Sequence, residues 1–322
     1  MRFILQRLTR FVVVFAIVTF GVMVLLRLGL DQPGDPARTM LGGFASDAEI
    51  AATNARYHLH DNYFVQYVYW MKLMIVDRDF GYSVSNSLPV STLIGQRIMT
   101  TLLLGTYALV ISVGIAVPVA VYSAYKRDRV LDRAAGLTSF AFVALPAVVV
   151  AVFLKFLFVE HWALFPRVAD KVYPWQDFGA HVRNFLLPTL TIALPTAAVL
   201  TRLQRSEMTL TLQSDFIGLA RAKGLPPRRI LWRHGLRNSL FTVLTSIGLQ
   251  VGAIIGGAIV AETFFDLDGM GSLLITAVLG TDLFTVQAVV AILVVAVVVT
   301  NLVVDLLYGV IDPRVRLASA LQ

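Results

Sequence analysis

The chain has 322 residues, of which 57% are hydrophobic and 15% are charged, and its mean hydropathy is +0.75. Because soluble domains carry roughly a quarter charged residues, this composition excludes an ordinary soluble protein. The sequence contains no cysteine, which excludes disulfides, thiolate metal sites and cysteine nucleophiles.

Six stretches without a charged residue predict membrane-spanning helices. A spanning helix needs about 20 mostly apolar residues to cross a hydrocarbon core of roughly 30 Å, and six such runs are not typical of buried soluble helices. The first stretch is expected to be retained as a span, because no small-residue cleavage motif precedes Asp31. The stretches are Phe11–Leu26, Ile98–Tyr125, Ala134–Leu154, Phe185–Thr201, Ser239–Ala261 and Leu283–Val304.

The longest polar segment, residues 31–97, is predicted to form a small helical segment outside the membrane. Turn-forming residues open it at 31–36, and Ser46 with Glu49 has the pattern of a capping box at a helix start. The aromatic side chains from Tyr63 to Trp70 are expected to pack against the bundle or lie at the membrane interface rather than stack on substrate. Apolar residues recur there at helical spacing: Phe64, Tyr67, Val68, Met71, Met74 and Ile75. The chain is therefore divided into a first helix with its N-terminal segment (1–30), an external segment (31–97) and a five-helix core (98–322).

The basic residues lie mostly on one side of the predicted spans. Seventeen Lys and Arg residues fall on the side of the two termini, and 8 fall on the opposite side. Since Lys and Arg accumulate in cytoplasmic loops, both termini are expected to be cytosolic. The formal net charge of +7 is explained by this topology, and no nucleic-acid binding is predicted.

The cytosolic segment Arg202–Asn238 is too polar for the bilayer, yet its apolar residues recur at helical spacing. Gly224-Leu225-Pro226-Pro227 is predicted to separate two helices, because Gly suits the position after a helix and Pro suits the first turn of the next one. The second helix is expected from Ile230 to Asn238. The first is predicted as one continuous helix from the residues Leu210, Leu212, Phe216, Ile217, Leu219 and Ala220.

Few ionisable residues fall within the spans: Arg27, Lys155, Glu262 and Asp305, all near predicted span ends. A proton- or sodium-driven carrier often places an acid deep in a span or pairs broken helices. The prolines at 118, 146, 188 and 195 are interpreted as plain kinks. An intramembrane hydrolase would need a Ser–His pair or paired acids, and neither these nor a cluster of metal ligands is visible. No catalytic or metal-binding residue is therefore assigned, and the phosphate-binding motif G-x-x-x-x-G-K-[ST] is absent from the sequence.

Several motifs, taken in order along the chain, resemble the permease subunits of ABC importers. The resemblance is closest to the dipeptide/oligopeptide branch, which also includes some nickel importers. Its most specific part is Ala220-Arg221-Ala222-Lys223-Gly224-Leu225 followed by Arg233-His234-x-Leu236-Arg237-Asn238, which resembles the cytoplasmic loop signature of that family. The chain departs from the family at Asp268–Gly271, where Pro-Gly-x-Gly is usual. The supporting motifs are Arg2–Leu8, Gly34–Ala37, Asp79–Ser83, Glu262–Phe265, Asn301–Tyr308 and Asp312–Arg316.

The resemblance implies an all-α integral membrane protein, a six-helix type I ABC importer transmembrane domain of the bacterial cytoplasmic (inner) membrane. It would form half of a pathway for di- or oligopeptides, without enzymatic activity or a cofactor of its own. The implied protein partners are a second homologous permease, an extracytoplasmic substrate-binding protein, and either two ATP-binding subunits or one fused ATPase. The ATPase would bind ATP and Mg. The chain would also contact the peptide substrate and membrane lipid. The alternatives are nickel or another small solute as substrate, or a secondary transporter, and no substrate-binding residue is assigned. The residues implied to couple the chain to the ATPase are Ala220, Arg221, Ala222, Lys223, Gly224, Leu225, Arg233, His234, Arg237 and Asn238.

Overall fold

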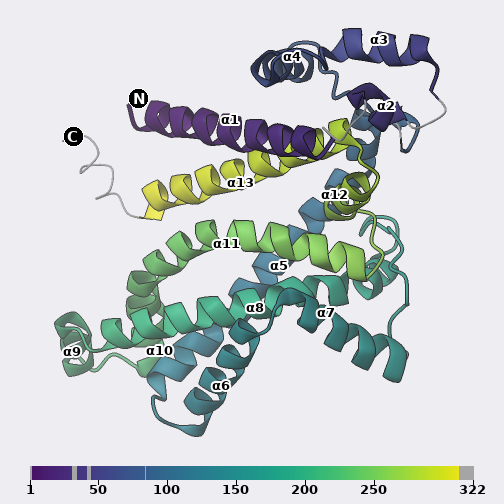
Figure 1. The fold of residues 1–322 in the computed structure, drawn as a ribbon. Coiled ribbons are helices and arrows are strands. Elements are labelled where there is room, and N and C mark those ends of the chain that lie inside the picture. Colours follow the sequence, from purple (N-terminus) through teal and green to yellow (C-terminus); the bar gives the residue numbers. More distant parts are fainter. Residues whose placement is uncertain (1, 31–34, 42–44, 84, 312–322) are drawn as a thin grey trace. The chain divides into compact units, whose positions relative to one another are not determined.

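The computed structural model describes residues 2–30, 35–41, 45–83 and 85–311, which fall into two compact units. One unit consists of residues 1–99 and 268–298, and the other of residues 100–267 and 299–322. Helices make up most of the described chain (Figure 1). Residues 31–34 of the predicted opening turn and the closing motif Asp312–Arg316 lie outside the described residues.

The first unit contains the helices predicted for the external segment. The Ser46 hydroxyl accepts a hydrogen bond from the backbone N–H of Glu49 (3.3 Å), and the Glu49 carboxylate accepts one from the backbone N–H of Ser46 (2.8 Å). These two bonds confirm the capping box, which satisfies N–H groups that a helix start leaves free. The elements are α1 (Arg2–Leu30), α2 (Pro36–Leu41), α3 (Asp47–Tyr57), α4 (Tyr63–Ile75), the short antiparallel strands β1 (Tyr82–Ser83) and β2 (Leu88–Pro89), the start of α5 (Val90–Tyr125), α12 (Met270–Leu279) and most of α13 (Leu283–Ile311).

Helix α4 packs against α1 through buried aromatic side chains. Tyr67 and Trp70 are 8% and 5% exposed, and the Tyr67 hydroxyl lies 2.8 Å from that of Thr19 on α1. The expectation that these aromatics pack in the bundle is confirmed for these two. The buried stripe is nevertheless shifted from the predicted one, because the Gln66 carboxamide turns inward and donates to backbone carbonyls of the preceding loop. Phe64, Val68 and Ile75 of the predicted stripe are exposed.

The second unit contains most of the predicted core. Helices α8 and α11 pack along each other, and an apolar cluster that includes Leu104 of α5, Phe185 of α8 and Ile254 of α11 lies between the N-terminal half of α8, the C-terminal half of α11 and α5. The elements are the rest of α5, α6 (Val130–Ala144), α7 (Ala147–Leu154), the π-helix η1 (Lys155–His161), α8 (Phe178–Leu212), α9 (Asp215–Ala222), α10 (Pro227–Arg229), the π-helix η2 (Ile230–Gly235) and α11 (Leu236–Phe264).

Five described helices are long and apolar enough to span a membrane, and a bent pair makes a sixth span if its two parts are counted together. This agrees with the predicted all-α membrane protein of six spans. The bent pair is the third predicted span, which turns by 106° between α6 and α7 (Figure 1). The interpretation of Pro146 as a plain kink is therefore wrong: it begins α7 after a break at Leu145, since proline lacks the N–H that would continue α6. Pro118, Pro188 and Pro195 lie inside helices that continue past them.

A buried carboxylate joins three helices at one end of the second unit. Asp132 on α6 is 5% exposed, and Arg205 on α8 donates to both of its oxygens, from Nε at 2.5 Å and from Nη2 at 2.6 Å. The hydroxyl of Ser123 on α5 and the backbone N–H of Asp128 donate to the same carboxylate. Such bidentate, charge-assisted bonds are the strong class of hydrogen bond, so they hold α5, α6 and α8 in a fixed relation.

Two of the four ionisable residues expected near span ends, Lys155 and Glu262, make contacts within the second unit. The Lys155 ammonium donates to the backbone carbonyl of Phe264 at 2.5 Å, and the fully buried Glu262 accepts a hydrogen bond from Thr101 at 2.5 Å. These bonds tie η1 and α5 to the last turn of α11. In the first unit Arg27 is 4% exposed, and the side chain of Asp305 lies outside the described part.

Asp132→Asn is expected to lower the free energy of unfolding by about 2 kcal/mol, because the charge partner of Arg205 and part of the fourfold hydrogen bonding are lost. Unfolding of the purified chain in detergent, followed by circular dichroism against denaturant, measures the change. The matched control is Asp128→Asn, since the Asp128 carboxylate is 82% exposed and its ion pair with Arg127 is long, at 3.7 Å. Equal destabilisation by both substitutions would contradict a special role of Asp132.

Candidate functional site

The predicted helix pair begins where α8 ends. The expectation of one continuous helix through Leu210 and Ala220 is wrong, because Ser214 adopts an extended backbone (φ −73°, ψ 153°) and starts a separate helix, α9. The Ser214 hydroxyl donates to the carbonyl of Thr211 at 2.6 Å, which stabilises this turn. The second predicted helix is present, and it continues through η2 without a break into the fifth span.

The turn after α9 forms as the glycine and prolines predict. Gly224 has φ +73°, a conformation in which residues with a Cβ are strained. Its N–H donates to the carbonyl of Arg221 (2.9 Å), and the N–H of Leu225 donates to that of Ala220 (3.2 Å). This pair of bonds is a Schellman motif, which satisfies carbonyls that the helix end leaves free. Pro227 then occupies the first turn of α10.

Helix α9 presents different chemistry on different faces. Ile217 and Ala220 are 0% and 7% exposed and pack in an apolar cluster that includes Met208 of α8 and Leu231 of η2. Phe216 and Leu219 lie three residues apart on another face and are 46% and 58% exposed. In the sequence, these two residues indicate only a helix. Apolar spacing alone does not tell which of Phe216 and Ile217 is buried, so their exposure comes from the structure.

The base of the segment is fixed to α8 by close packing. A Cβ at Gly235 would lie 2.6 Å from the Sδ-methyl carbon of Met208, so glycine permits η2 to approach α8. The Gln204 amide on α8 also donates to the hydroxyl of Ser239 on α11 at 2.8 Å, where both side chains are buried. The exposed tip of α9 is therefore carried on a rigid support.

The ten residues that the resemblance implies for coupling to the ATPase differ in solvent exposure. Ala220 is buried, and Leu225 and His234 are half-buried. The amide of Asn238 donates to the carbonyl of His234 at 2.7 Å, which directs part of this side chain to its own helix. The exposed members are Arg221, Ala222, Lys223, Gly224, Arg233, Arg237 and Asn238.

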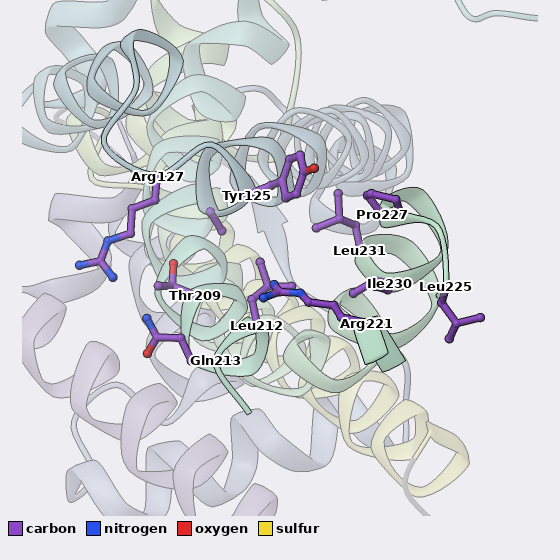
Figure 2. A pocket seen from close by; sticks show the side chains of 11 residues that line it. Tyr125, Arg127, Thr209, Leu212, Gln213, Arg221, Leu225, Pro227, Ile230 and Leu231 are labelled. Atoms are coloured by element: carbon purple, nitrogen blue, oxygen red, sulfur yellow. The ribbon is translucent and has the colours of Figure 1, made fainter. Parts of the chain in front are cut away.

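A cavity of about 520 Å³, which the sequence pattern does not predict, lies beside the segment. It is lined by the end of α5, the end of α8, α9 and the turn into η2 (Figure 2). Arg221 extends across it toward Leu212 of α8, although its side chain is still exposed to solvent. No group of three or more potential metal ligands occurs in the part of the chain that the structure describes.

Comparison with known proteins covers nearly the whole chain. Residues 116–317 match the model of the family described as binding-protein-dependent transport system inner membrane component, and residues 1–105 match the model of its N-terminal part. The chain is 32% identical to a probable peptide ABC transporter permease of Sinorhizobium fredii, over 98% of this chain and 99% of that protein. It is 34% identical to the oligopeptide transport system permease AppB of Bacillus subtilis (88% and 90%) and 32% identical to the dipeptide transport system permease DppB of Escherichia coli (98% and 99%).

These matches extend over the α2–α4 region, the apolar spans and the α8–α11 segment alike. The chain is thus a transport component, and it belongs to the family of binding-protein-dependent ABC transporter permeases of the inner membrane.

Proposed function

We propose that the chain forms half of a transmembrane pathway through which di- or oligopeptides enter the cell. The names of the relatives described above support peptides as the substrate class over a nickel chelate or another small solute. An extracytoplasmic binding protein delivers the peptide, and a second, homologous permease supplies the other half of the pathway. Separate nucleotide-binding subunits, either two chains or one fused ATPase, bind ATP and Mg and supply the energy.

The observation that carries the coupling role is the exposed apolar pair Phe216 and Leu219 on a short helix outside the apolar spans. Leaving a Leu or Phe side chain in water forgoes about 1.5–3 kcal/mol of burial, so a partner surface stabilises the pair. The same segment carries exposed basic side chains at Lys223, Arg233 and Arg237, which can attract acidic groups of a partner. In our proposal this face docks on the ATPase, and motions of the ATPase reach the spans through the packed base of α9.

The segment Arg202–Asn238 and both termini then lie in the cytosol, and the α2–α4 region lies outside. The basic asymmetry of 17 to 8 supports this orientation. In the proposed cycle, ATP binding closes the nucleotide-binding subunits, α9 follows them, and the pathway alternates between outward and inward access.

A first prediction separates strain within the chain from contact with a partner. Gly224 is exposed and no atom lies within 4 Å of a Cβ built on it, so Gly224→Ala and Gly224→Leu should each cost about 1 kcal/mol in the isolated chain, from backbone strain alone. In the assembled transporter the Leu variant should bind the ATPase at least tenfold more weakly than the Ala variant, because its bulk crowds the partner. Denaturant unfolding and ATPase binding to the permease in nanodiscs measure the two effects. Equal ATPase binding by the two variants would show that Gly224 does not face the partner closely.

A second prediction concerns the apolar face. Leu219→Gln should weaken ATPase attachment by about tenfold or more and reduce ATP-driven peptide uptake, because a docked leucine contributes about 1.5–3 kcal/mol. The matched control is Leu210→Gln on α8, where the leucine is 62% exposed, similar to the 58% of Leu219. Quantitative co-purification of the ATPase with each variant is the measurement. If Leu219→Gln and Leu210→Gln reduce ATPase co-purification equally, the apolar face of α9 is not the ATPase contact.

A third prediction concerns orientation. The chain has no cysteine, so single cysteines can be introduced at the exposed positions Ala48 on α3 and Arg228 on α10. A membrane-impermeant maleimide should label Ala48→Cys in intact spheroplasts, and Arg228→Cys only after permeabilisation. Labelling of both from the same side would refute the six-span topology.

A further inference from the structure

Helix α4 packs against the middle of the first apolar span. The Tyr67 hydroxyl on α4 lies 2.8 Å from the hydroxyl of Thr19 and 3.4 Å from the carbonyl oxygen of Ala16, both on α1. The Tyr67 ring also meets the Phe20 ring edge to face, with 5.3 Å between their centroids. Farther toward the C-terminal end of α1, the two helices border one small cavity, and the residues that they contribute to it are Met23, Arg27, Gln66, Tyr69, Trp70 and Leu73.

The sequence of α1 fixes the depth of this contact in a membrane. The apolar stretch Phe11–Leu28 has 18 residues, and at 1.5 Å per residue it is about 27 Å long, close to the hydrocarbon thickness of roughly 30 Å. Arg2, Arg7 and Arg10 precede the stretch, so the hydrocarbon core does not extend farther toward the N-terminus. Thr19 is the ninth of the 18 residues and therefore lies near the centre of the bilayer.

Helix α4 consequently lies at the depth of the hydrocarbon. A tyrosine side chain is much shorter than half of the core, which is about 15 Å, so the α4 backbone at Tyr67 lies inside the leaflet. The 13 residues of α4 are too few to cross the bilayer, since a spanning helix needs about 20. The Asn62 side chain accepts a hydrogen bond from the backbone N–H of Phe64 at 2.8 Å, which satisfies a group that hydrocarbon cannot satisfy.

The exposed face of α4 is apolar. Phe64, Val68 and Ile75 recur at helical spacing and are 63%, 51% and 63% exposed. A helix on the surface of a soluble domain turns its polar residues to the water, and α4 does the opposite. Lys72 is the one charged residue of the helix, and its long stem lets the ammonium reach the headgroups while the methylenes stay among apolar groups.

We propose that α4 is embedded in the membrane without crossing it. It lies in the leaflet that surrounds the C-terminal half of the α1 span, and its face formed by Phe64, Val68 and Ile75 contacts the lipid acyl chains. The depth set by Thr19 favours lipid over a soluble protein as the occupant of this face, because a soluble protein does not reach the bilayer centre. In the orientation proposed above this is the outer leaflet, so α4 is the part of the α2–α4 region that enters the membrane.

The test uses the full-length chain in phosphatidylcholine/phosphatidylglycerol nanodiscs. Because the chain has no cysteine, Val68→Cys and Ile75→Cys can each carry a single nitroxide label at an exposed position. Electron paramagnetic resonance power saturation measures how accessible each label is to molecular oxygen, which concentrates in lipid, and to a neutral nickel chelate, which stays in water. Ile17→Cys, at a side chain that is 65% exposed within the α1 span, gives the values for lipid contact, and Ala48→Cys on α3 gives those for water.

Both α4 labels should match Ile17→Cys in oxygen accessibility. Their accessibility to the nickel chelate should be at least about tenfold lower than that of Ala48→Cys, because moving a polar solute from water into hydrocarbon costs several kcal/mol. Nickel accessibility equal to that of Ala48→Cys would place α4 in water and overturn the proposal. Low accessibility to both reagents would show that a polypeptide covers this face, which would overturn it as well. The measurement involves neither ATPase nor peptide, so its outcome is independent of the proposed transport function.

Discussion

The ion pair between Asp132 and Arg205 is the interaction on which the arrangement of the second unit depends. A carboxylate with 5% exposure is costly unless donors surround it, and here Arg205, Ser123 and the backbone of Asp128 supply them. The pair sets where α5 ends, where α6 begins and how the last turns of α8 lie. The loop that carries Arg127 and the helix end that carries α9 both follow directly from these fixed points.

Features encoded over a few residues were predicted from the sequence, and features that join distant segments were not. The capping box at Ser46 and the left-handed turn at Gly224 depend on neighbours within four residues, so their patterns identify them. Arg205 was counted only as a basic loop residue, because its partner Asp132 lies 73 positions away. The break at Pro146 was missed for another reason. The sequence of the third span stays apolar across the break, and hydropathy does not tell whether a helix changes direction.

The structure explains how a helix as short as α9 keeps a defined shape. An isolated helix of eight residues is not stable in water, since nucleation costs more than so few hydrogen bonds return. Ile217 and Ala220 anchor one side in an apolar cluster, and the Schellman motif closes the end. The rigidity that α9 needs to transmit a displacement therefore comes from tertiary packing. The exposed residues of α9 are not needed for this packing, so they are available to contact a partner.

The sharp turn between α6 and α7 also has a consequence for solvation. A helix end leaves backbone carbonyls without intrahelical partners, and a helix start leaves N–H groups in the same state. Lipid hydrocarbon cannot form hydrogen bonds with these groups, and each unsatisfied group costs several kcal/mol. Ala144, Leu145 and Pro146 are all exposed in the single chain, at a point in the middle of an apolar span. In a membrane this stretch must therefore face water or another polypeptide, so lipid tails cannot be its neighbour once the transporter is assembled.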